Sequence, residues 1–422
     1  MFLSVTPFQQ IKQAKKEAPF LALLSTEQKN QILRALSKKL KAHQKLILSA
    51  NREDLAEGAK HYPKGIPDRL ELTPERLFDI AESLDQLALL PDPVGQVIDR
   101  RVRPNGLQLS RVRVPIGVIG ILYEARPNVT IDAAALCLKS GNAVLLKGGH
   151  AARHTNLALV RVIHESLEAN GVSPHAVQLI DTRDRAVMKK ILQHAHEIDC
   201  IIPRGGKGLI DFVRKNSRIP VIETGASVVH LYIDSEADLK KAIAVTVNAK
   251  TRRVSICNAL DVLLVHAKIA QRFLPKLSEA LIQKEPLTEL RADPKLHRYF
   301  KNYPKLKKIN SKDFDTEFLD YVLAIRTVEN PDEALAHIAK HSLRHSEGIV
   351  TENKETAERF LRTVDAACVY HNASTQFSDG GEFGLGSEIG ISTQKLHARG
   401  PFALEGLTTY KWVIHGDGQI RS

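Results

Sequence analysis

Cys257 is the side chain in this sequence whose surroundings best suit nucleophilic chemistry. It follows a polar stretch, residues 250–256, that contains two adjacent arginines, and it precedes Asn258. Positive charge near a thiol favours the thiolate, which is the reactive form of cysteine. Cys257 is therefore a candidate nucleophile, although these residues alone also fit an unreactive cysteine at a junction between two elements.

The other cysteines lie among apolar residues. Cys137 belongs to the run AAALCL, and Cys200 and Cys368 belong to short apolar runs with the composition of strands. We expect all three to be small core residues. Four cysteines without a C-x-x-C pair exclude a disulfide scaffold and a zinc ribbon, and they indicate a reduced, cytoplasmic protein.

Two glycine-containing loops could bind phosphate. One begins at Lys147 and continues through Gly148 and Gly149. The other contains Gly205 and Gly206, and both loops directly follow apolar runs. Backbone amides at the start of a helix bind phosphate, whereas either loop alone would also fit a tight turn beside solvated basic residues. Two such loops at the carboxyl ends of parallel strands favour a nucleotide site.

Three histidines, His337, His341 and His345, recur at intervals of four residues. Side chains at this spacing could bind zinc from one face of a helix, but no carboxylate or cysteine completes the set at a suitable spacing. Because cationic groups suit the end of a helix, we expect a solvated helix end and predict no metal site.

A long stretch near the C-terminus, residues 372–401, is rich in glycine and in hydrogen-bonding side chains. Loops of this length are uncommon in compact domains unless they are functional. The stretch is therefore either a surface loop or, as the sharper hypothesis, a wall of an active site.

The elements that must position these residues follow an alternating pattern. Short apolar runs alternate with helical stretches over residues 115–234 and again over 238–371. Such strand–helix–strand units predict parallel sheets that are covered on both faces. We therefore predict an α/β protein of two lobes with a border near Ser235, and a surface excursion at the lysine- and proline-rich segment 285–310. The runs expected to be strands are 117–123, 142–147, 176–180, 200–203, 228–234, 259–266, 321–326, 348–351 and 368–371.

The remaining segments are helical or form a hairpin. The first ninety residues have helical periodicity, as at 26–47 and 73–90. Residues 96–113 alternate in polarity around Pro104-Asn105-Gly106, which predicts a β-hairpin. Five arginines on the hairpin fit a nucleic-acid arm, although no aromatic residue lies between them for base stacking. They fit equally well an arm that pairs with another subunit.

Composition limits the class of protein without deciding its function. The chain has 422 residues and a formal net charge of +12, with 43% apolar and 26% charged residues. These values exclude a disordered or collagen-like chain, and the length predicts two or three domains. The longest uncharged apolar stretch has about half the length of a membrane span. The positive charge could attract nucleic acid or anionic substrates, or serve solubility alone.

Five motifs occur in an order and spacing that resemble those of the glutamate-5-semialdehyde dehydrogenases, or γ-glutamyl phosphate reductases, of the aldehyde dehydrogenase superfamily. They are VPIGVIGILYEARPNVT at 114–130, SGNAVLLKGG at 140–149, IIPRGG at 201–206, CNA at 257–259 and STQKLHARGP at 392–401. The resemblance covers nearly the whole chain. It implies an aldehyde dehydrogenase-like α/β fold with a cofactor-binding domain (1–95 and 114–234), a catalytic domain (235–403) and a small β oligomerisation element (96–113 and 404–422).

The resemblance also implies a reaction in proline biosynthesis. In this family a thiolate, here that of Cys257, attacks the acyl phosphate of L-glutamyl 5-phosphate, and phosphate leaves. NADPH then reduces the thioester, which yields L-glutamate 5-semialdehyde. By position in the superfamily, the Asn128 amide and the Cys257 backbone N–H would form the oxyanion hole.

Cofactor residues follow from the same resemblance. Lys147 corresponds to the superfamily lysine at the adenosine ribose, where a cation also suits a 2′-phosphate. Gly205 and Gly206 would lie beside the pyrophosphate. Glu317 resembles the superfamily glutamate that holds the nicotinamide ribose.

Three polar residues, Arg126, Asn372 and Arg399, are candidates for binding the carboxylates or the phosphate of the substrate. A planar guanidinium group matches such anions. Glu223 lies where aldehyde dehydrogenases keep a base that activates water. We assign it no catalytic role, because a reductase that releases phosphate needs no hydrolytic water.

The chain departs from the family pattern at two positions: Val254 stands where the family often has proline, and Val229 where it often has cysteine. A homo-oligomer is expected, and a complex with glutamate 5-kinase would be chemically sensible because the acyl phosphate is labile in water. No membrane or nucleic-acid partner is expected. The alternatives are a dehydrogenase of another aldehyde or acyl phosphate, and a non-catalytic basic protein that binds nucleic acid through the hairpin.

Overall fold

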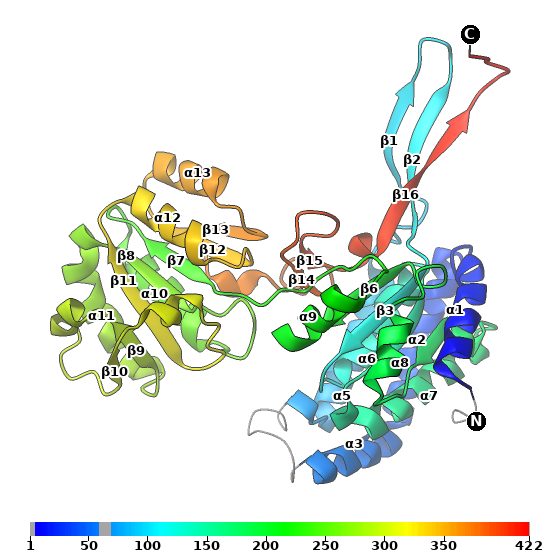
Figure 1. Ribbon diagram of the computed structural model, residues 1–422, viewed down its shortest axis with the longest axis horizontal. Coiled ribbons are helices and arrows are strands. Elements are labelled where there is room, and N and C mark those ends of the chain that lie inside the picture. The colour runs from blue at the N-terminus through cyan, green and yellow to red at the C-terminus, as the bar shows by residue number, and fades with distance from the viewer. Residues whose placement is uncertain (1–4, 59–68, 422) are drawn as a thin grey trace. The chain divides into compact units, whose positions relative to one another are not determined.

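The computed structural model describes residues 5–58 and 69–421, which form two compact units (Figure 1). We call them the first unit and the second unit and describe each by itself. The first unit comprises Met1–Thr224, Gly384–Gly390 and Phe402–Ser422, and the second comprises Gly225–Phe383 and Ile391–Pro401. The chain therefore changes from one unit to the other after residues 224, 383, 390 and 401.

Helices begin the first unit, as predicted. They are α1 (Pro7–Leu21), α2 (Thr26–Ala42), α3 (Gln44–Gly58) and α5 (Pro74–Leu89). The Ser25 hydroxyl accepts a hydrogen bond from the Gln28 N–H, and the Gln28 side chain accepts one from the Ser25 N–H, so a capping box begins α2. The stretch 26–47 is two helices rather than one, because the chain leaves helical geometry at His43. Thr73 and Pro74 begin α5 as predicted.

A four-stranded parallel sheet lies at the centre of the first unit, in the order β5-β4-β3-β6. Its strands are β3 (Val118–Tyr123), β4 (Ala143–Lys147), β5 (Val177–Leu179) and β6 (Cys200–Arg204). The helices that follow these strands are α6 (Asn128–Lys139), α7 (Arg153–Ala169), α8 (Arg185–Ile191) and α9 (Lys207–Asn216). Every residue of β3 is buried, as expected for a strand covered on both faces.

Three antiparallel strands form an arm of the first unit that Figure 1 shows extending beyond its helices. The predicted hairpin is confirmed as β1 (Val97–Val102) and β2 (Gln108–Pro115), and β16 (Thr408–His415) pairs with the other edge of β2. Although no aromatic residue lies between the hairpin arginines in the sequence, β16 brings aromatic rings to them. The guanidinium of Arg111 lies 5.1 Å from the ring centre of Tyr410 and 5.8 Å from that of Trp412.

A seven-stranded parallel sheet lies at the centre of the second unit, in the order β10-β9-β11-β8-β7-β12-β13. Its strands are β7 (His230–Ile233), β8 (Val262–His266), β9 (Glu289–Ala292), β10 (Leu306–Lys308), β11 (Val322–Val328), β12 (Ser346–Val350) and β13 (Cys368–His371). Its helices include α10 (Leu239–Thr251), α11 (Ala267–Lys284), α12 (Pro331–His341) and α13 (Lys354–Thr363). Two parallel sheets with helices between their strands confirm the predicted α/β class.

The border between the units lies earlier than the predicted position near Ser235. The run 228–234, placed in the first lobe from the sequence, forms β7 and pairs with β8 and β12 of the second sheet. The units therefore divide between Thr224 and Gly225. Alternation of strands and helices predicts that a strand exists, but it does not show which of two sheets the strand joins.

The prediction of a surface excursion at 285–310 was wrong. This segment contains β9 and β10, which extend the second sheet, and a 3₁₀ helix at Pro294–Tyr299. The apolar residues spaced between its lysines and prolines enter the core: Leu290, Ala292, Leu296, Phe300 and Tyr303 are buried. The prediction used the average composition of the segment, which does not reveal how its apolar residues are spaced.

The prediction of a solvated helix end at the three histidines was also wrong. His337 is 4% exposed and His345, which follows the end of α12, is 0% exposed. The His337 ring packs edge-on against Phe314, with ring centres 4.8 Å apart. Burial lowers the pKa of His337 to about 2, and nearby His230 adds to the effect. His337 and His345 are therefore neutral core residues, whereas His341, the last residue of α12, is half-buried.

Candidate active site

The sequence-predicted site residues divide between the two units. Arg126, Asn128, Lys147, Gly205 and Gly206 belong to the first unit, and Cys257, Glu317, Asn372 and Arg399 belong to the second. Throughout residues 5–58 and 69–421, no cluster of three or more histidine, cysteine or acidic side chains is arranged to hold a metal ion, and no helix is both long and apolar enough to cross a membrane.

The first unit gathers its group at the carboxyl edge of the sheet. β3 pairs with β4 on one side and β6 on the other, so the strand order reverses at β3. Lys147 is the last residue of β4, and Gly205 and Gly206 directly follow β6. Ligands of open parallel sheets bind at this edge where the order reverses. The structure thus brings both predicted glycine loops to the same edge.

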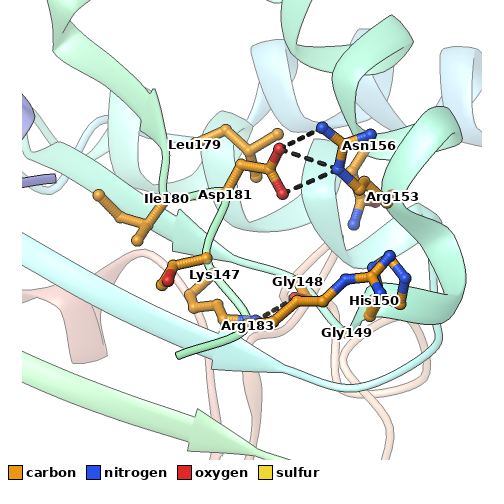
Figure 2. Close-up of a pocket in the computed structure, with 11 residues that line it drawn as sticks. Lys147, Gly148, Gly149, His150, Arg153, Asn156, Leu179, Ile180, Asp181 and Arg183 are labelled. Atoms are coloured by element: carbon orange, nitrogen blue, oxygen red, sulfur yellow. Dashed lines mark hydrogen bonds and ion pairs between the residues drawn. The ribbon is translucent and has the colours of Figure 1, made fainter. Parts of the chain in front are cut away.

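A pocket lies beside Lys147 (Figure 2). The Lys147 ammonium donates to the carbonyl of Gly148 at 2.8 Å, and burial lowers the pKa of Lys147 while the charge of Asp181 raises it. Arg153 holds Asp181 through three N–H···O contacts of 2.6 to 3.0 Å. The pocket is lined by Lys147, Gly148, Gly149, His150, Arg153, Asn156, Leu179, Ile180, Asp181, Thr182 and Arg183.

Two further basic side chains line this pocket. They are His150 and Arg183, and burial together with the charge of Arg183 lowers the pKa of His150. Because Arg153 already neutralises Asp181, the charges of Lys147 and Arg183 remain as the excess around the pocket. The lining therefore suits an anionic ligand.

Close packing fixes the glycine loop that follows Lys147. A Cβ atom at Gly148 would lie 2.1 Å from Nδ2 of Asn156, and one at Gly149 would lie 3.1 Å from the backbone nitrogen of Ala125. Asn156 cannot easily move aside, because it is buried and its Oδ1 accepts a hydrogen bond from Thr130 Oγ1 at 2.8 Å. Only glycine fits position 148 without a rearrangement.

The second glycine loop begins α9 and already holds a carboxylate. The Gly206 N–H donates to Oε2 of Glu124 at 3.1 Å, and a Cβ at Gly205 would lie 2.7 Å from the carboxyl carbon of Glu124. The carboxylate satisfies the Gly206 N–H and places negative charge at the N-terminus of α9. A pyrophosphate bound there would take the place of the Glu124 carboxylate.

Asn128 is the first residue of α6 and is half-buried. Its Nδ2 donates to Oδ2 of Asp132 at 3.1 Å. Burial raises the pKa of Asp132 to about 6, although part of its surface reaches solvent and the charge of Arg204 acts in the opposite direction. Because an amide nitrogen carries two hydrogens, this bond is compatible with donation to an oxyanion as well. Arg126, two residues earlier, is also half-buried.

Cys257 differs from the other cysteines in its surroundings. It lies between α10 and β8 in a segment without regular secondary structure, and it is half-buried. Cys137, Cys200 and Cys368 are buried, as predicted. Burial raises the pKa of Cys200 to about 12 and shifts that of Cys137 in the same direction, which keeps both as thiols. Cys257 is therefore the cysteine that reagents and substrates can reach.

Two buried charged residues, Lys250 and Asp261, hold backbone groups in the region around Cys257, which the sequence did not reveal. Nζ of Lys250 donates to the carbonyl of Leu260 at 2.9 Å, and burial lowers the pKa of Lys250 to about 8. The Asp261 carboxylate accepts from the backbone N–H groups of Val229 at 3.2 Å and Phe318 at 3.1 Å. Burial raises the pKa of Asp261 to about 6.

Glu317 directly precedes Phe318 and is half-buried. Its Oε1 accepts a hydrogen bond from Ser227 Oγ at 3.1 Å. The neighbouring Phe318 N–H donates to Asp261, so the same carboxylate that holds Val229 also fixes the loop that carries Glu317. Valine at position 229 is compatible with this contact, because Val229 contributes only its backbone N–H to the Asp261 carboxylate.

The two remaining candidates of the second unit have partners of their own. Asn372 has a φ of 55°, and its amide bonds both the N–H and the carbonyl of Thr351 at 3.0 Å. Arg399 is exposed and donates to Asp365 at 2.7 Å, and hydrogen bonds from Lys395 and Arg399 lower the pKa of Asp365 to about 2. A substrate would have to replace or share these contacts.

Comparison with known proteins assigns the chain to a family. The model of the aldehyde dehydrogenase family matches residues 8–288. The chain is 50% identical to gamma-glutamyl phosphate reductase of Moorella thermoacetica over 97% of both chains, and 51% identical to that of Bacteroides thetaiotaomicron over 98% of both. It is also similar to the crystal structure of gamma-glutamyl phosphate reductase from Thermotoga maritima, with 44% identity, a TM-score of 0.94 and coverage of 98% of this chain and 99% of that one. The chain therefore belongs to the gamma-glutamyl phosphate reductases of the aldehyde dehydrogenase family.

Proposed function

We propose that this chain reduces L-glutamyl 5-phosphate to L-glutamate 5-semialdehyde with NADPH and releases phosphate, in proline biosynthesis. The proposal rests on one contrast within a member of this family: of four cysteines, only Cys257 is both half-buried and placed in a loop. A covalent route needs a reachable thiol. Relatives about 50% identical carry the name gamma-glutamyl phosphate reductase over nearly their full lengths.

In the proposed mechanism, the Cys257 thiolate attacks the acyl carbon. The Asn128 amide and the Cys257 N–H stabilise the oxyanion that develops on the carbonyl oxygen. Phosphate leaves as the carbonyl re-forms, and a thioester to Cys257 remains. NADPH, when bound, supplies the hydride that takes this thioester to the aldehyde level, and the thiolate of Cys257 is released again. Glu223 forms an ion pair with Arg214, consistent with the absence of any step that needs a base for water.

The pocket beside Lys147 supports NADPH as the cofactor. Lys147 and Arg183 contribute positive charge, and the one carboxylate of the lining, Asp181, is already paired with Arg153. A 2′-phosphate would meet cations there without facing an unpaired carboxylate. In this proposal Gly205 and Gly206 hold the pyrophosphate, and Glu317 holds the nicotinamide ribose.

Substrate binding is proposed for Arg126, with Asn372 and Arg399 as further candidates. Arg126 lies two residues before Asn128 in the loop between β3 and α6, so a guanidinium at that position would be near the proposed oxyanion hole. The amide of Asn372 and the guanidinium of Arg399 each bond within the second unit. For these two residues the proposal therefore requires an exchange of partners.

We propose that the arm joins copies of this chain into a homo-oligomer. Its strands expose apolar and aromatic side chains, among them Val102 at 74% and Ile414 at 58%, and such patches mark association surfaces. Nucleic acid is less well supported, because the hairpin arginines have carboxylate partners: Arg101 pairs with Asp99 at 2.8 Å and Arg113 with Glu405 at 2.7 Å. Location in the cytoplasm and a complex with glutamate 5-kinase, which would protect the labile acyl phosphate, complete the proposal.

The reverse reaction tests the function directly. Purified protein should oxidise glutamate semialdehyde only when NADP and phosphate are both present, and other semialdehydes should react more slowly. Cys257→Ala should abolish turnover while the protein stays folded. Turnover in the Cys257→Ala variant would exclude the thiol mechanism. A folded parent protein that is inactive with glutamate semialdehyde but active with another aldehyde would identify a different dehydrogenase.

A further inference from the structure

A short buried segment after β13 contacts the loop that carries Cys257. We call residues 374–378 the anchor segment and residues 252–258 the nucleophile loop. Thr375 is 0% exposed, Gln376 3% and Ser378 1%. The segment forms one turn of 3₁₀ helix at Thr375–Phe377, which begins at the Ser374 side chain. Both segments belong to the second unit.

Gln376 holds the start of the nucleophile loop. Its Nε2 donates to the carbonyl of Ala249 at 2.7 Å and to that of Arg253 at 3.3 Å, and its Oε1 accepts from Arg252 at 3.3 Å. Carbonyls at the end of a helix have no partner within the helix. Gln376 supplies partners at the end of α10, and it thereby fixes the direction in which the chain leaves that helix.

Thr375 holds the other end of the nucleophile loop. Its Oγ1 donates to the carbonyl of Asn258, the residue after Cys257, at 2.8 Å. In return, Nδ2 of Asn258 donates to the carbonyl of Ser378 at 2.9 Å. Cys257 therefore lies next to a residue whose backbone and side chain are both bonded to the anchor segment.

The anchor segment is itself held by the second sheet. Ser378 Oγ donates to the carbonyl of Thr375 at 3.0 Å and lies 2.9 Å from Ser346 Oγ, at the start of β12. Nδ1 of His345 lies 2.9 Å from the same Ser346 hydroxyl. Buried polar networks of this kind rigidify the groups that they connect. The anchor segment thus connects the nucleophile loop to the start of β12 through hydrogen bonds.

We propose that Thr375 and Gln376 are positioning residues that hold Cys257 at the site of attack. The proposal rests on the proposed role of Cys257 as nucleophile, and neither residue needs to touch the substrate. A displacement of a reacting group by about 1 Å costs up to about a hundredfold in rate. Loss of either contact should therefore lower kcat and leave KM nearly unchanged.

Position 375 offers a matched pair of variants. Thr375→Val keeps the shape and removes the hydroxyl, whereas Thr375→Ser keeps the hydroxyl and removes a methyl group. We expect kcat to fall about tenfold in Thr375→Val with KM for both substrates within about twofold, and Thr375→Ser to recover most of the loss. Gln376→Glu, which replaces the donor with an acceptor facing two carbonyls, should fall at least as far.

Amide hydrogen exchange separates this proposal from the proposed function. Peptides that cover residues 252–260 should exchange faster in Thr375→Val and Gln376→Glu than in the parent or in Thr375→Ser, whether or not the protein is a reductase. Equal exchange and equal kcat in Thr375→Val and the parent would overturn the proposal. So would equal losses in Thr375→Val and Thr375→Ser, or an effect confined to KM. An inactive parent with the expected exchange pattern would refute the function and leave the anchor in place.

Discussion

The candidate site residues of the two units are positioned by different means. In the first unit, Lys147 ends a strand, and the tight packing of Gly148 against Asn156 leaves the following loop little freedom. In the second unit, Cys257 lies outside regular structure, and side chains 117 and 127 residues from their partners hold its loop. The candidate binding residue Lys147 is thus placed by its own strand, whereas the candidate nucleophile Cys257 depends on distant side chains.

The largest expected effect is a loss of turnover, without a loss of cofactor affinity, when Cys257 is replaced. Cys257→Ser should lower turnover by at least about a thousandfold, because a serine hydroxyl without an adjacent base is a poor nucleophile. The affinity for NADPH, measured by calorimetry, should stay within about twofold, because the proposed cofactor residues of the first unit are untouched. Cys368→Ala, at a buried cysteine of β13, is the control and should retain turnover. A large loss of NADPH affinity in Cys257→Ser would show that the proposed cofactor site depends on Cys257.

The second prediction concerns a substitution that removes a proposed cofactor contact and leaves Cys257 unchanged. Lys147→Ala should raise KM for NADPH about tenfold or more, with a smaller effect on NADH, because a charged partner of the 2′-phosphate is lost. Alkylation of Cys257 by iodoacetamide should proceed at the parent rate. Lys189→Ala, on the exposed side of α8, should change neither quantity. Equal effects on NADPH and NADH would argue against a 2′-phosphate site beside Lys147.

Packing around the first glycine loop can be tested through stability. Gly148→Ala should lower the free energy of unfolding by about 1–3 kcal/mol, because the new methyl group would overlap Nδ2 of the buried Asn156. Gly208→Ala is the matched control: it lies in α9 with no atom within 4 Å of the added Cβ, and it should be neutral or stabilising by up to about 1 kcal/mol. Urea unfolding measures both. A harmless Gly148→Ala would mean that Asn156 moves aside and that packing does not set the loop.

The smallest expected effect is on the stability of the protein at acidic pH. Burial lowers the pKa of His337 from 6.5 to about 2, so the unfolded chain gains a proton that the folded second unit excludes. Stability should therefore fall as the pH drops below about 6.5, by at most about 1.4 kcal/mol per pH unit for this group. The raised pKa of Asp261 acts with the opposite sign between about pH 4 and 6.

Comparing variants with the parent protein isolates the contribution of His337 to the pH dependence of stability. Urea unfolding between about pH 7 and pH 5 should show a shallower pH dependence for His337→Gln than for the parent. His341→Gln, at the half-buried last residue of α12, should keep the parent slope. An unchanged slope in His337→Gln would show that this imidazole does not control the acid response.

Much of the fold was predictable because its signals are local. The runs around β3, β4 and β6 are short and apolar, and the loops after β4 and β6 contain glycine, so the edge that holds Lys147 and Gly206 followed from the sequence. The hairpin was predictable from Pro104-Asn105-Gly106 for the same reason. Sheet membership was not: whether β7 belongs with the first or the second sheet depends on pairing between distant strands.

The residues that hold the loop of the candidate nucleophile were harder to predict from the sequence. Cys257 stands out in the sequence because arginines precede it. No residue near it in the sequence predicts the contacts that Thr375 and Gln376, which follow β13, make with its loop. Lys250 begins the polar stretch before Cys257, but the fold buries it, and its ammonium donates to the carbonyl of Leu260. The histidines of α12 misled in the same way, because a polar residue gives no sign of its burial until its neighbours are known.

The division of the first unit into three stretches of chain has a consequence for synthesis on the ribosome. Its β16 comes from the last part of the sequence, Leu407 is fully buried, and the Leu407 carbonyl accepts a hydrogen bond from Asn142 at 2.9 Å. These contacts cannot form until residues after 402 have been translated. Domains generally fold in order from the N-terminus, but here the first unit can form its parallel sheet early, whereas its arm and the Asn142–Leu407 contact must wait until the second unit has been translated.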